Sequence, residues 1–483
     1  MSSLPNTFQR ACARVVLLAT SILLTVCGGG GGDKKSTVAG GTATVTVTSP
    51  VEQIYEGDTV QLVATARDAA GNVLVGKTVT WSSRDEEFFP VSDTGVLKTW
   101  AYGSVIVAAE IDGVSGSLSL TIDPIKVSVT VGAKEVVFDW TSERCEDLDL
   151  PDGPARFVRA GDGSLVMFSG NAPRYYVSRG TGFNSIKRDC RQPALVSADL
   201  RTPESYENWE WIWTVYREGN TWHALVHNEF HDAVAATCRP GDPSPGNPCW
   251  YNSITYAVST DDARSFSKPF APAYVVAPAP NAWVPPSSPV PIGQWAVEGY
   301  LNPSNIVRAN DGYYYSFLLA IPTQNWTAPA GLCVFRTNTL DDPPSWRAWD
   351  GSGFNLRMTS PYVTGSPAPV CAFLRTLTPI GQIVYSTYLE RYMNVSQGDV
   401  DGRSGFFFSV SADLIHWSEP RLLVEAGVLE PVTVSGPAIV DHADTTVNFE
   451  RAGPTPYLYY IRFNDGGLDR DLVRVPLTFT RLN

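Results

Sequence analysis

The chain has 483 residues and a formal net charge of −13, from 36 lysines and arginines against 49 aspartates and glutamates. This acidic balance argues against binding along a nucleic-acid backbone, which requires clustered basic side chains, so no nucleic-acid partner is expected. The 40 glycines, 36 prolines, 20 tyrosines and 20 phenylalanines favour a turn-rich, all-β protein. The length allows two or three domains, each with its own core.

The first 26 residues have the pattern of a signal peptide. Arg10 and Arg14 precede the apolar run VVLLATSILLTV, which is too short by about eight residues to span a bilayer. The run leads into LTVC, which resembles the bacterial lipobox, although a valine stands where that motif prefers a small residue. We therefore expect lipidation at Cys27, followed by a glycine-rich tether over residues 27–41. The protein would be exported and anchored by lipid to the outer membrane or cell surface; plain secretion is the alternative.

Six cysteines remain after removal of the signal peptide and lipidation of Cys27. An even number in an exported protein predicts disulfides, and six cysteines allow fifteen pairings. The safest pair is the local one, Cys238 with Cys249, and none of the spacings is typical of a zinc site. The six are Cys145, Cys190, Cys238, Cys249, Cys333 and Cys371.

Residues 42–123 alternate apolar and polar side chains and break at Gly, Asp and Asn, which is typical of short antiparallel strands. The stretch resembles a bacterial Ig-like domain of group 2. The resemblance rests on TWSS at residues 80–83, on TGV at residues 94–96 and on the strand pair over residues 103–122. It implies a β-sandwich with Trp81 in its core, acting as a spacer or stalk without catalysis. Residues 124–144 are expected to be a linker or a closing strand of the next domain.

The remainder of the chain, residues 145–483, repeats two phrases. VRAGDGSLVMF at residues 158–168 returns as VRANDGYYYSF at residues 307–317, and Asp-Gly between two apolar runs is a strong hairpin signal. VSTDDARSFSKP at residues 258–269 matches VSADLIHWSEP at residues 410–420. Repeated units of this kind predict a propeller, and five blades fit the spacing. Six blades and a two-sheet sandwich remain the alternatives.

The second phrase resembles the Asp-box of sialidases and a turn of the five-bladed propeller glycoside hydrolases. Residues 145–483 therefore resemble that superfamily, which holds families 43, 32 and 62, in architecture more than in motifs. The resemblance implies a pair of carboxylates in the central funnel, a general base near Asp152 and a general acid near Glu298. Such hydrolysis requires one protonated and one ionised carboxyl group.

Acidic residues near the innermost strands are the catalytic candidates. Asp152 precedes the first copy of the repeated hairpin, and Glu229 lies in WHALVHNEFHD, which the preceding turn indicates is a strand rather than a zinc-binding helix. On a strand, His223, His227, Glu229 and His231 share one face. The alternative for Asp152 is a turn-stabilising role. The predicted catalytic residues are Asp152, Glu229, Glu298 and Asp441.

Substrate-binding residues are expected beside these acids. Asn and Ser in the stretch LNPSNIV can bind sugar hydroxyls, although capping a turn is a serious alternative. Tryptophans can stack on sugars, although packing between blades is the commoner role. The predicted substrate-binding residues are Arg156, His227, Asn228, Asn302, Asn305 and Trp250.

Two functions stay open on the sequence. The first is an exported glycoside hydrolase acting on an oligo- or polysaccharide, and the alternative is a non-catalytic carbohydrate-binding or adhesion protein with the Ig-like domain as its stalk. A sialidase is a weaker third choice, because it needs an arginine triad. We expect a monomer that contacts the membrane through its anchor only, without a metal or other cofactor, although calcium in the funnel stays open.

Overall fold

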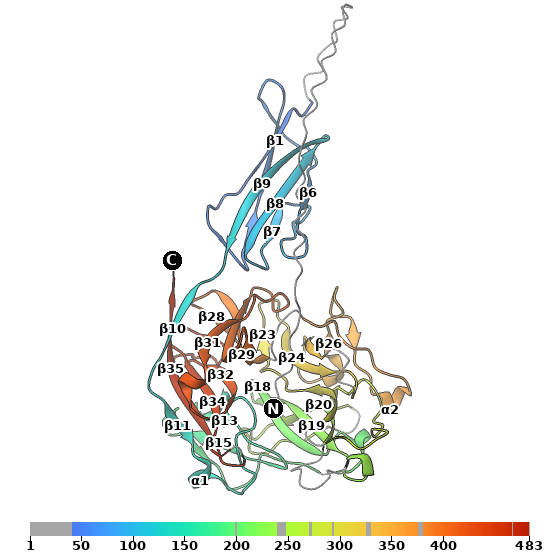
Figure 1. The fold of residues 1–483 in the computed structure, drawn as a ribbon, viewed down its shortest axis with the longest axis vertical. Helices are drawn as coiled ribbons and strands as arrows, with labels where there is room; N and C mark the ends of the chain where they lie inside the picture. The colour runs from blue at the N-terminus through green and yellow to red at the C-terminus, as the bar shows by residue number, and fades with distance from the viewer. Residues whose placement is uncertain are drawn as a thin grey trace, which may run out of the picture.

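The computed structural model describes residues 41–198, 200–238, 248–269, 273–291, 294–324, 330–374, 380–465 and 467–482. Strands dominate these residues, and the predicted all-β fold is confirmed (Figure 1). The predicted signal peptide and Cys27 lie outside the described residues. No helix in the described part of the chain is long and apolar enough to cross a membrane. The helices are single turns, α1 (Trp140–Glu143), α2 (Pro361–Thr364) and α3 (Ala426–Leu429), with 3-10 turns at Pro203–Ser205, Ala236–Cys238 and Pro343–Ser345.

The N-terminal part is a two-layer β-sandwich. One layer has the strand order β2-β9-β8-β6, and the other is formed by β1-β4-β5 and by β3-β7. Its core is apolar, and Leu97 and Val107 are fully buried in it. Trp81 is partly buried and packs against this core, where the sequence predicted it. The strands are β1 (Thr44–Thr48), β2 (Ile54–Tyr55), β3 (Thr59–Gln61), β4 (Val63–Arg67), β5 (Val73–Leu74), β6 (Thr80–Ser83), β7 (Val96–Lys98), β8 (Gly103–Ile111) and β9 (Val114–Asp123).

Five antiparallel units follow, which we call blades 1 to 5 of a propeller. In each blade the first strand lies innermost and the later strands follow outward. Blade 1 holds β12 (Arg156–Arg159), β13 (Leu165–Phe168), β15 (Val177–Gly180) and β16 (Lys187–Arg188), beside the pair β14 (Arg174–Tyr175) and β17 (Leu195–Val196). Blade 2 holds β18 (Trp209–Glu218), β19 (Thr221–His231), β20 (Cys249–Ser259) and β21 (Val275–Ala277).

The other three blades complete the ring. Blade 3 holds β22 (Ala296–Leu301), β23 (Val307–Arg308), β24 (Tyr314–Ile321), β25 (Gly331–Thr337), β26 (Arg347–Ala348) and β27 (Leu356–Arg357). Blade 4 holds β28 (Ile380–Ser386), β29 (Arg391–Val400), β30 (Arg403–Ser411) and β31 (Arg421–Glu425), with β33 (Arg451–Ala452) paired to β28. Blade 5 holds β32 (Val434–Val440), β34 (Tyr457–Phe463) and β35 (Arg470–Arg481).

The segment between the two parts closes the propeller. β10 (Val127–Val131) and β11 (Glu135–Phe138) both pair antiparallel with β35, so they supply the outer strand of blade 5. Of the two predicted roles for residues 124–144, the structure shows the closing strand. The last blade is therefore built from both sides of the propeller sequence, which ties the end of the chain to its beginning.

The repeated phrases form the same structures in different blades. In β12–β13 and β23–β24 the turn closes with equivalent backbone bonds, and Gly163 and Gly312 have φ angles of 84° and 85°. The side chains of Asp162 and Asp311 each accept a backbone N–H two residues on. The shared residues are therefore scaffold, because they shape the turn rather than any site.

Blades 2 and 3 are joined by a parallel pairing of β20 with β22 that brings Gly299 against Asn252. Gly299 has a φ of +113°, and a Cβ there would lie 1.9 Å from the Asn252 carbonyl oxygen. We expect Gly299→Ala to lower the free energy of unfolding, measured in urea, by clearly more than Gly312→Ala. The latter meets open space and carries only backbone strain of about 1–2 kcal/mol. Equal losses in the two variants would contradict this.

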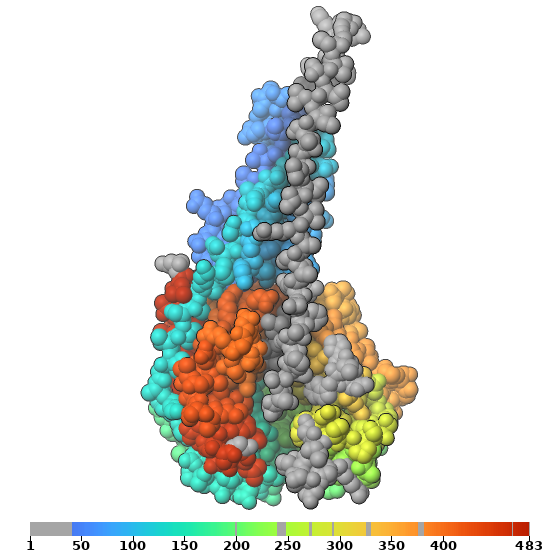
Figure 2. Space-filling model, in the orientation of Figure 1, coloured from blue at the N-terminus to red at the C-terminus, as the bar shows by residue number. Residues whose placement is uncertain are grey.

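The sandwich and the propeller meet through polar and aromatic contacts. Glu56 and Asp58 of the sandwich form ion pairs with Arg421 and Arg391 of blade 4. Trp100 stacks on His416, with ring centroids 3.4 Å apart. The sandwich projects from this junction as a narrow extension of the broader propeller (Figures 1 and 2). Arg391 lies at the connection from β28 to β29, and His416 and Arg421 lie at the connection from β30 to β31. Both connections are at the same end of blade 4, so the sandwich sits at the end of the propeller where the innermost strands finish.

Candidate functional site

Two of the predicted acids come together at the other end of the propeller, where the innermost strands begin. Asp152 precedes β12, and Glu229 lies near the end of β19, which runs back toward the start of β18. The pairing of β19 with β18 and β20 places Glu229 beside Trp209 and Asn252, on the same face as His227 and His231. The alternation of the strand thus gathers the predicted histidines and carboxylate on one face.

Asp152 forms an ion pair with Arg470, which begins β35 in blade 5. The carboxyl side chain keeps 37% of its surface exposed, and Trp211 of β18 lies beside it. Surrounding protein raises the pKa of Asp152 to about 6; the charge of Arg470 opposes this shift, and the charge of Glu229 adds to it. Asp152 therefore holds a proton at a higher pH than an ordinary aspartate.

The surroundings of Glu229 shift its pKa in the opposite direction, downward. His231 Nε2 lies 2.9 Å from one carboxylate oxygen, and His227 Nε2 lies 3.6 Å from the other. Burial raises the pKa of Glu229, but the hydrogen bond from His231 and the charges of both histidines outweigh it, so the pKa lies below its usual value. Glu229 is thus held ionised beside a carboxyl group that keeps its proton up to a pH of about 6.

Such a pair can perform acid–base chemistry on a glycosidic bond. Two carboxyl groups whose surroundings drive their pKa values apart define an acid and a base. Asp152 can give its proton to the leaving oxygen, while ionised Glu229 can attack the anomeric carbon or take a proton from water. The resemblance implied a general base near Asp152, whereas its raised pKa favours the acid role.

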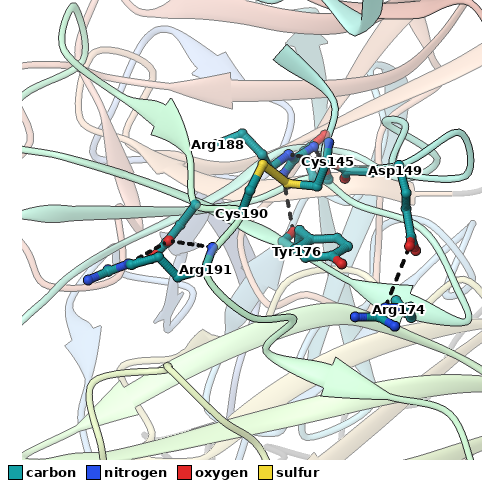
Figure 3. The surroundings of a disulfide bond; sticks show 10 residues. Cys145, Asp149, Arg174, Tyr176, Arg188, Cys190 and Arg191 are labelled. Atoms are coloured by element: carbon teal, nitrogen blue, oxygen red, sulfur yellow. Dashed lines mark hydrogen bonds and ion pairs between the residues drawn. A yellow bond between two sulfur atoms is a disulfide. The ribbon is translucent and has the colours of Figure 1, made fainter.

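The segment that carries Asp152 is fixed by a disulfide and a buried ion pair. Cys145 is bonded to Cys190, and Asp149 accepts from the Cys145 N–H at 3.0 Å (Figure 3). Asp149 also pairs with Arg188 at 3.2 Å, and both side chains are buried. The other disulfides join Cys333 to Cys371 and, as predicted, Cys238 to Cys249.

The structure does not bring Glu298 to this pair. Glu298 lies opposite Tyr251 in the pairing of β20 with β22, whereas Glu229 lies opposite Asn252. Adjacent residues of a strand face opposite sides, so Glu298 points away from Glu229. Its carboxylate accepts from Asn281 Nδ2 at 2.7 Å, and burial raises its pKa to about 7.

Asp441 lies at the opposite end of the funnel. It follows the innermost strand β32, whereas Asp152 precedes the innermost strand β12. Its carboxylate accepts from the N–H groups of Ala443 and Gly453, which shapes a turn. Residues 441–450 close this end by hydrogen bonding to every other blade. Their partners are Arg159, Arg217, Arg308 and Tyr385.

Three of the predicted substrate-binding residues serve the scaffold. Asn305 exchanges two hydrogen bonds of 2.7 Å with the backbone of Ile383 in blade 4. Asn228 is buried, accepts from the Asn208 N–H and donates to Ser253. Asn302 has a φ of +53° between β22 and β23, where it turns the chain.

The other three lie along the funnel or beside the pair. Arg156 reaches from blade 1 to blade 4, where it donates to the Gly381 carbonyl at 2.6 Å, and burial lowers its pKa to about 9. His227 is buried and bonds to Asn252 Oδ1 at 3.0 Å. Trp250 is half-buried and stacks on His231. Of these three, His227 lies next to Glu229, and Trp250 is connected to it through His231.

Two residues of the site were missed by sequence reasoning. Arg470 begins β35 and pairs with Asp152, 318 positions away in the sequence. His231 was noticed in the strand pattern but not chosen, although it shares the face of Glu229. That shared face was the available signal for His231, whereas no local pattern marks Arg470. Within the described residues no group of three or more His, Cys, Asp or Glu could hold a metal ion.

Comparison with known proteins gives similarity to solved structures alone. No protein-family profile and no curated protein matches the chain. An endo-arabinase from Bacteroides thetaiotaomicron aligns over 72% of this chain and 98% of its own, at 12% identity and TM-score 0.38. A family 117 glycoside hydrolase from Zobellia galactanivorans aligns over 74% of this chain and 91% of its own, at 8% identity and TM-score 0.40. An α-L-arabinanase from Cellvibrio cellulosa in complex with arabinohexaose aligns over 67% of this chain and 91% of its own, at 13% identity and TM-score 0.37. Because these values are low, we draw no functional conclusion from them.

Proposed function

We propose that the chain is an exported glycoside hydrolase that cleaves an oligo- or polysaccharide with Asp152 as proton donor and Glu229 as the ionised carboxylate. The observation that carries this proposal is the pair itself. Two carboxyl groups from different blades lie close enough for the charge of Glu229 to raise the pKa of Asp152, while histidines lower that of Glu229. This division of roles is what glycoside hydrolysis requires.

The architecture supports an exported, surface-anchored enzyme. Three disulfides suit an oxidising compartment. The sandwich precedes the propeller and meets it at the end opposite the carboxylate pair. In Figure 1 the sandwich lies at the upper end and α1, which leads into the Asp152 segment, at the lower end. With a lipid on Cys27, the pair would face away from the membrane.

A carbohydrate-binding protein without activity is the second candidate. The ion pair of Asp152 with Arg470 favours this candidate. A carboxyl group beside a cation loses its proton at a lower pH, and without the proton it cannot act as a general acid. Aromatic side chains beside Glu229 suit glycan binding whether or not hydrolysis follows.

The deciding experiment is a screen of plant, algal and bacterial glycans for newly formed reducing ends. We expect the wild type to release them, and Asp152→Asn and Glu229→Gln to release almost none. Asp147→Asn is the matched control, because Asp147 lies on the same segment with 81% of its side chain exposed. A wild type that binds a glycan in the same screen but releases nothing would replace the hydrolase proposal with the second candidate.

The pH dependence gives an independent check. We expect kcat/KM to fall as the pH rises above about 6, because Asp152 must carry its proton to act as the acid. Arg470→Met removes a charge that lowers the pKa of Asp152, so the fall should move to higher pH. Arg403→Met, whose arginine pairs with Glu425 in blade 4, should leave it in place. An unchanged or lowered position in Arg470→Met would argue against Asp152 as the acid.

A further inference from the structure

Arg156 places a buried positive charge in the funnel of the propeller. It is the first residue of β12, the innermost strand of blade 1, and its Nη2 donates to the Gly381 carbonyl oxygen of blade 4 at 2.6 Å. Blade 1 packs against blade 2 on one side and against blade 5 on the other. A side chain that reaches from blade 1 to blade 4 must therefore cross the funnel. Arg156 is only 3% exposed, so its guanidinium has almost no contact with bulk solvent.

This guanidinium has no carboxylate partner among the residues that the structure describes. Its Nε and Nη1 groups are buried without a hydrogen-bond acceptor. Burial lowers the pKa of Arg156 to about 9, and in the described part of the chain the one charge acting against this shift belongs to Tyr175. Burial raises the pKa of Tyr175, so this phenol is neutral at pH 7. Arg156 is therefore a buried cation at neutral pH, and no described side chain neutralises it.

Two other arginines with little exposure show the usual arrangement of a buried charge. Arg188 pairs with Asp149 at 3.2 Å, and Arg474 pairs with Glu135 at 2.6 Å. A charge that leaves water loses far more hydration than a neutral donor does, so buried charges are normally paired. Water beside Arg156 would accept from its N–H groups but would not neutralise its charge. An anion there would supply the negative charge that the two carboxylates supply in the other cases.

The surroundings of Arg156 limit which anion can bind. The nearest acids of the site already have partners, because Asp152 pairs with Arg470 and Glu229 bonds to His231. Since Arg156 is almost fully enclosed, the group that contacts it must be small. The side chain of Asp152, four residues earlier on the same segment, is 37% exposed, so solvent and small ions reach the layer next to Arg156. A halide ion or a single carboxylate group meets these conditions, and each forms strong, charge-assisted hydrogen bonds with a guanidinium.

We propose that Arg156 binds a small anion in the funnel, deeper than the Asp152–Glu229 pair, and that this anion is a halide ion or the carboxylate group of an acidic sugar. The two sources share one chemistry, a small group of negative charge that accepts hydrogen bonds from the guanidinium. The inference goes beyond the proposed function and does not depend on it, because anion binding is measured without turnover. The bound anion would also fix the guanidinium that connects blade 1 to Gly381 of blade 4, so it should stabilise the folded propeller.

Urea unfolding of the full chain at neutral pH tests the proposal in solution, with sodium chloride, sodium bromide or sodium glucuronate added in increasing concentration. Above the dissociation constant, the ratio of folded to unfolded wild type should rise about tenfold for each tenfold rise in the anion that binds. Arg156→Met should lose this rise, and Arg156→Lys should keep a weaker one. Arg179→Met is the matched control for general salt effects, because Arg179 lies in the same blade and already pairs with Asp189. It should respond to the anions as the wild type does.

Crystals of the wild type grown in sodium bromide or in sodium glucuronate locate the anion without any variant having to fold. We expect bromide, seen by its anomalous scattering, or the glucuronate carboxylate within hydrogen-bonding distance of Nε or Nη1 of Arg156. A rise with glucuronate but with neither halide would assign the site to the carboxylate of a sugar, and the reverse would assign it to an inorganic anion. The proposal is overturned if no anion gives a rise that depends on Arg156, or if both crystals hold only water beside Nε and Nη1.

Discussion

Glu229→Gln and Asp152→Asn are each expected to lower kcat/KM for a natural glycan by about 10²–10⁴-fold, because each removes one half of an acid–base pair. The two losses should have different causes. Without Asp152 no proton reaches the leaving oxygen, so an aryl glycoside with a nitro-substituted, weakly basic leaving group should recover most of the rate. Without Glu229 the attack on the anomeric carbon fails, and the same aryl glycoside should recover little.

The double variant tests whether the two residues act as one unit. Groups that act together lose little more when both are removed than when one is removed, so the double variant should resemble the worse single variant. Asp147→Asn, on the same segment but exposed, should retain wild-type kinetics for both substrates. Full multiplication of the two single losses, or recovery of Glu229→Gln by the aryl glycoside, would contradict the assigned roles.

The parts of the fold that could be predicted are those determined by neighbouring residues. The two copies of the repeated hairpin could be recognised because Asp-Gly and the alternation on either side of it determine a turn and two strands locally. The same alternation correctly placed His227, Glu229 and His231 on one face of β19. The Cys238–Cys249 disulfide was predictable for the same reason, because only ten residues separate its cysteines in the sequence.

What sequence alone could not resolve is which end and which face a residue occupies. Asp441 and Asp152 both adjoin innermost strands, but one follows its strand and the other precedes it, so they lie at opposite ends. Glu298 depends on the parallel register of β22 against β20, and a shift of one residue would turn it to the other face. Arg470 reaches Asp152 only because β35 of the last blade closes the ring beside the first. Contacts of this kind depend on closure of the whole propeller.

The buried ion pair behind the Asp152 segment is expected to give the largest loss of stability. Arg188→Met leaves Asp149 as an unpaired carboxylate in a site where both side chains are at most 1% exposed. Removing one partner of such a pair costs about 3–5 kcal/mol, because the remaining charge has neither water nor a counter-ion. Arg188 also donates to the carbonyls of Tyr176 and Ser169, so its loss frees two acceptors as well. Urea unfolding monitored by tryptophan fluorescence measures the change.

Two matched variants identify the cause of that loss. Arg191→Met removes an arginine on the other side of Cys190 that is 76% exposed and pairs with Asp189, and it should leave the free energy of unfolding nearly unchanged. Adding Asp149→Leu to Arg188→Met removes the stranded charge, so the double variant should be more stable than Arg188→Met alone. If the double variant is instead the less stable, the loss comes from packing and from the two carbonyls rather than from the unpaired carboxylate. Because Asp149 and Asp152 share one segment beside the Cys145–Cys190 disulfide, Arg188→Met should also lower hydrolytic activity at temperatures where the protein remains folded.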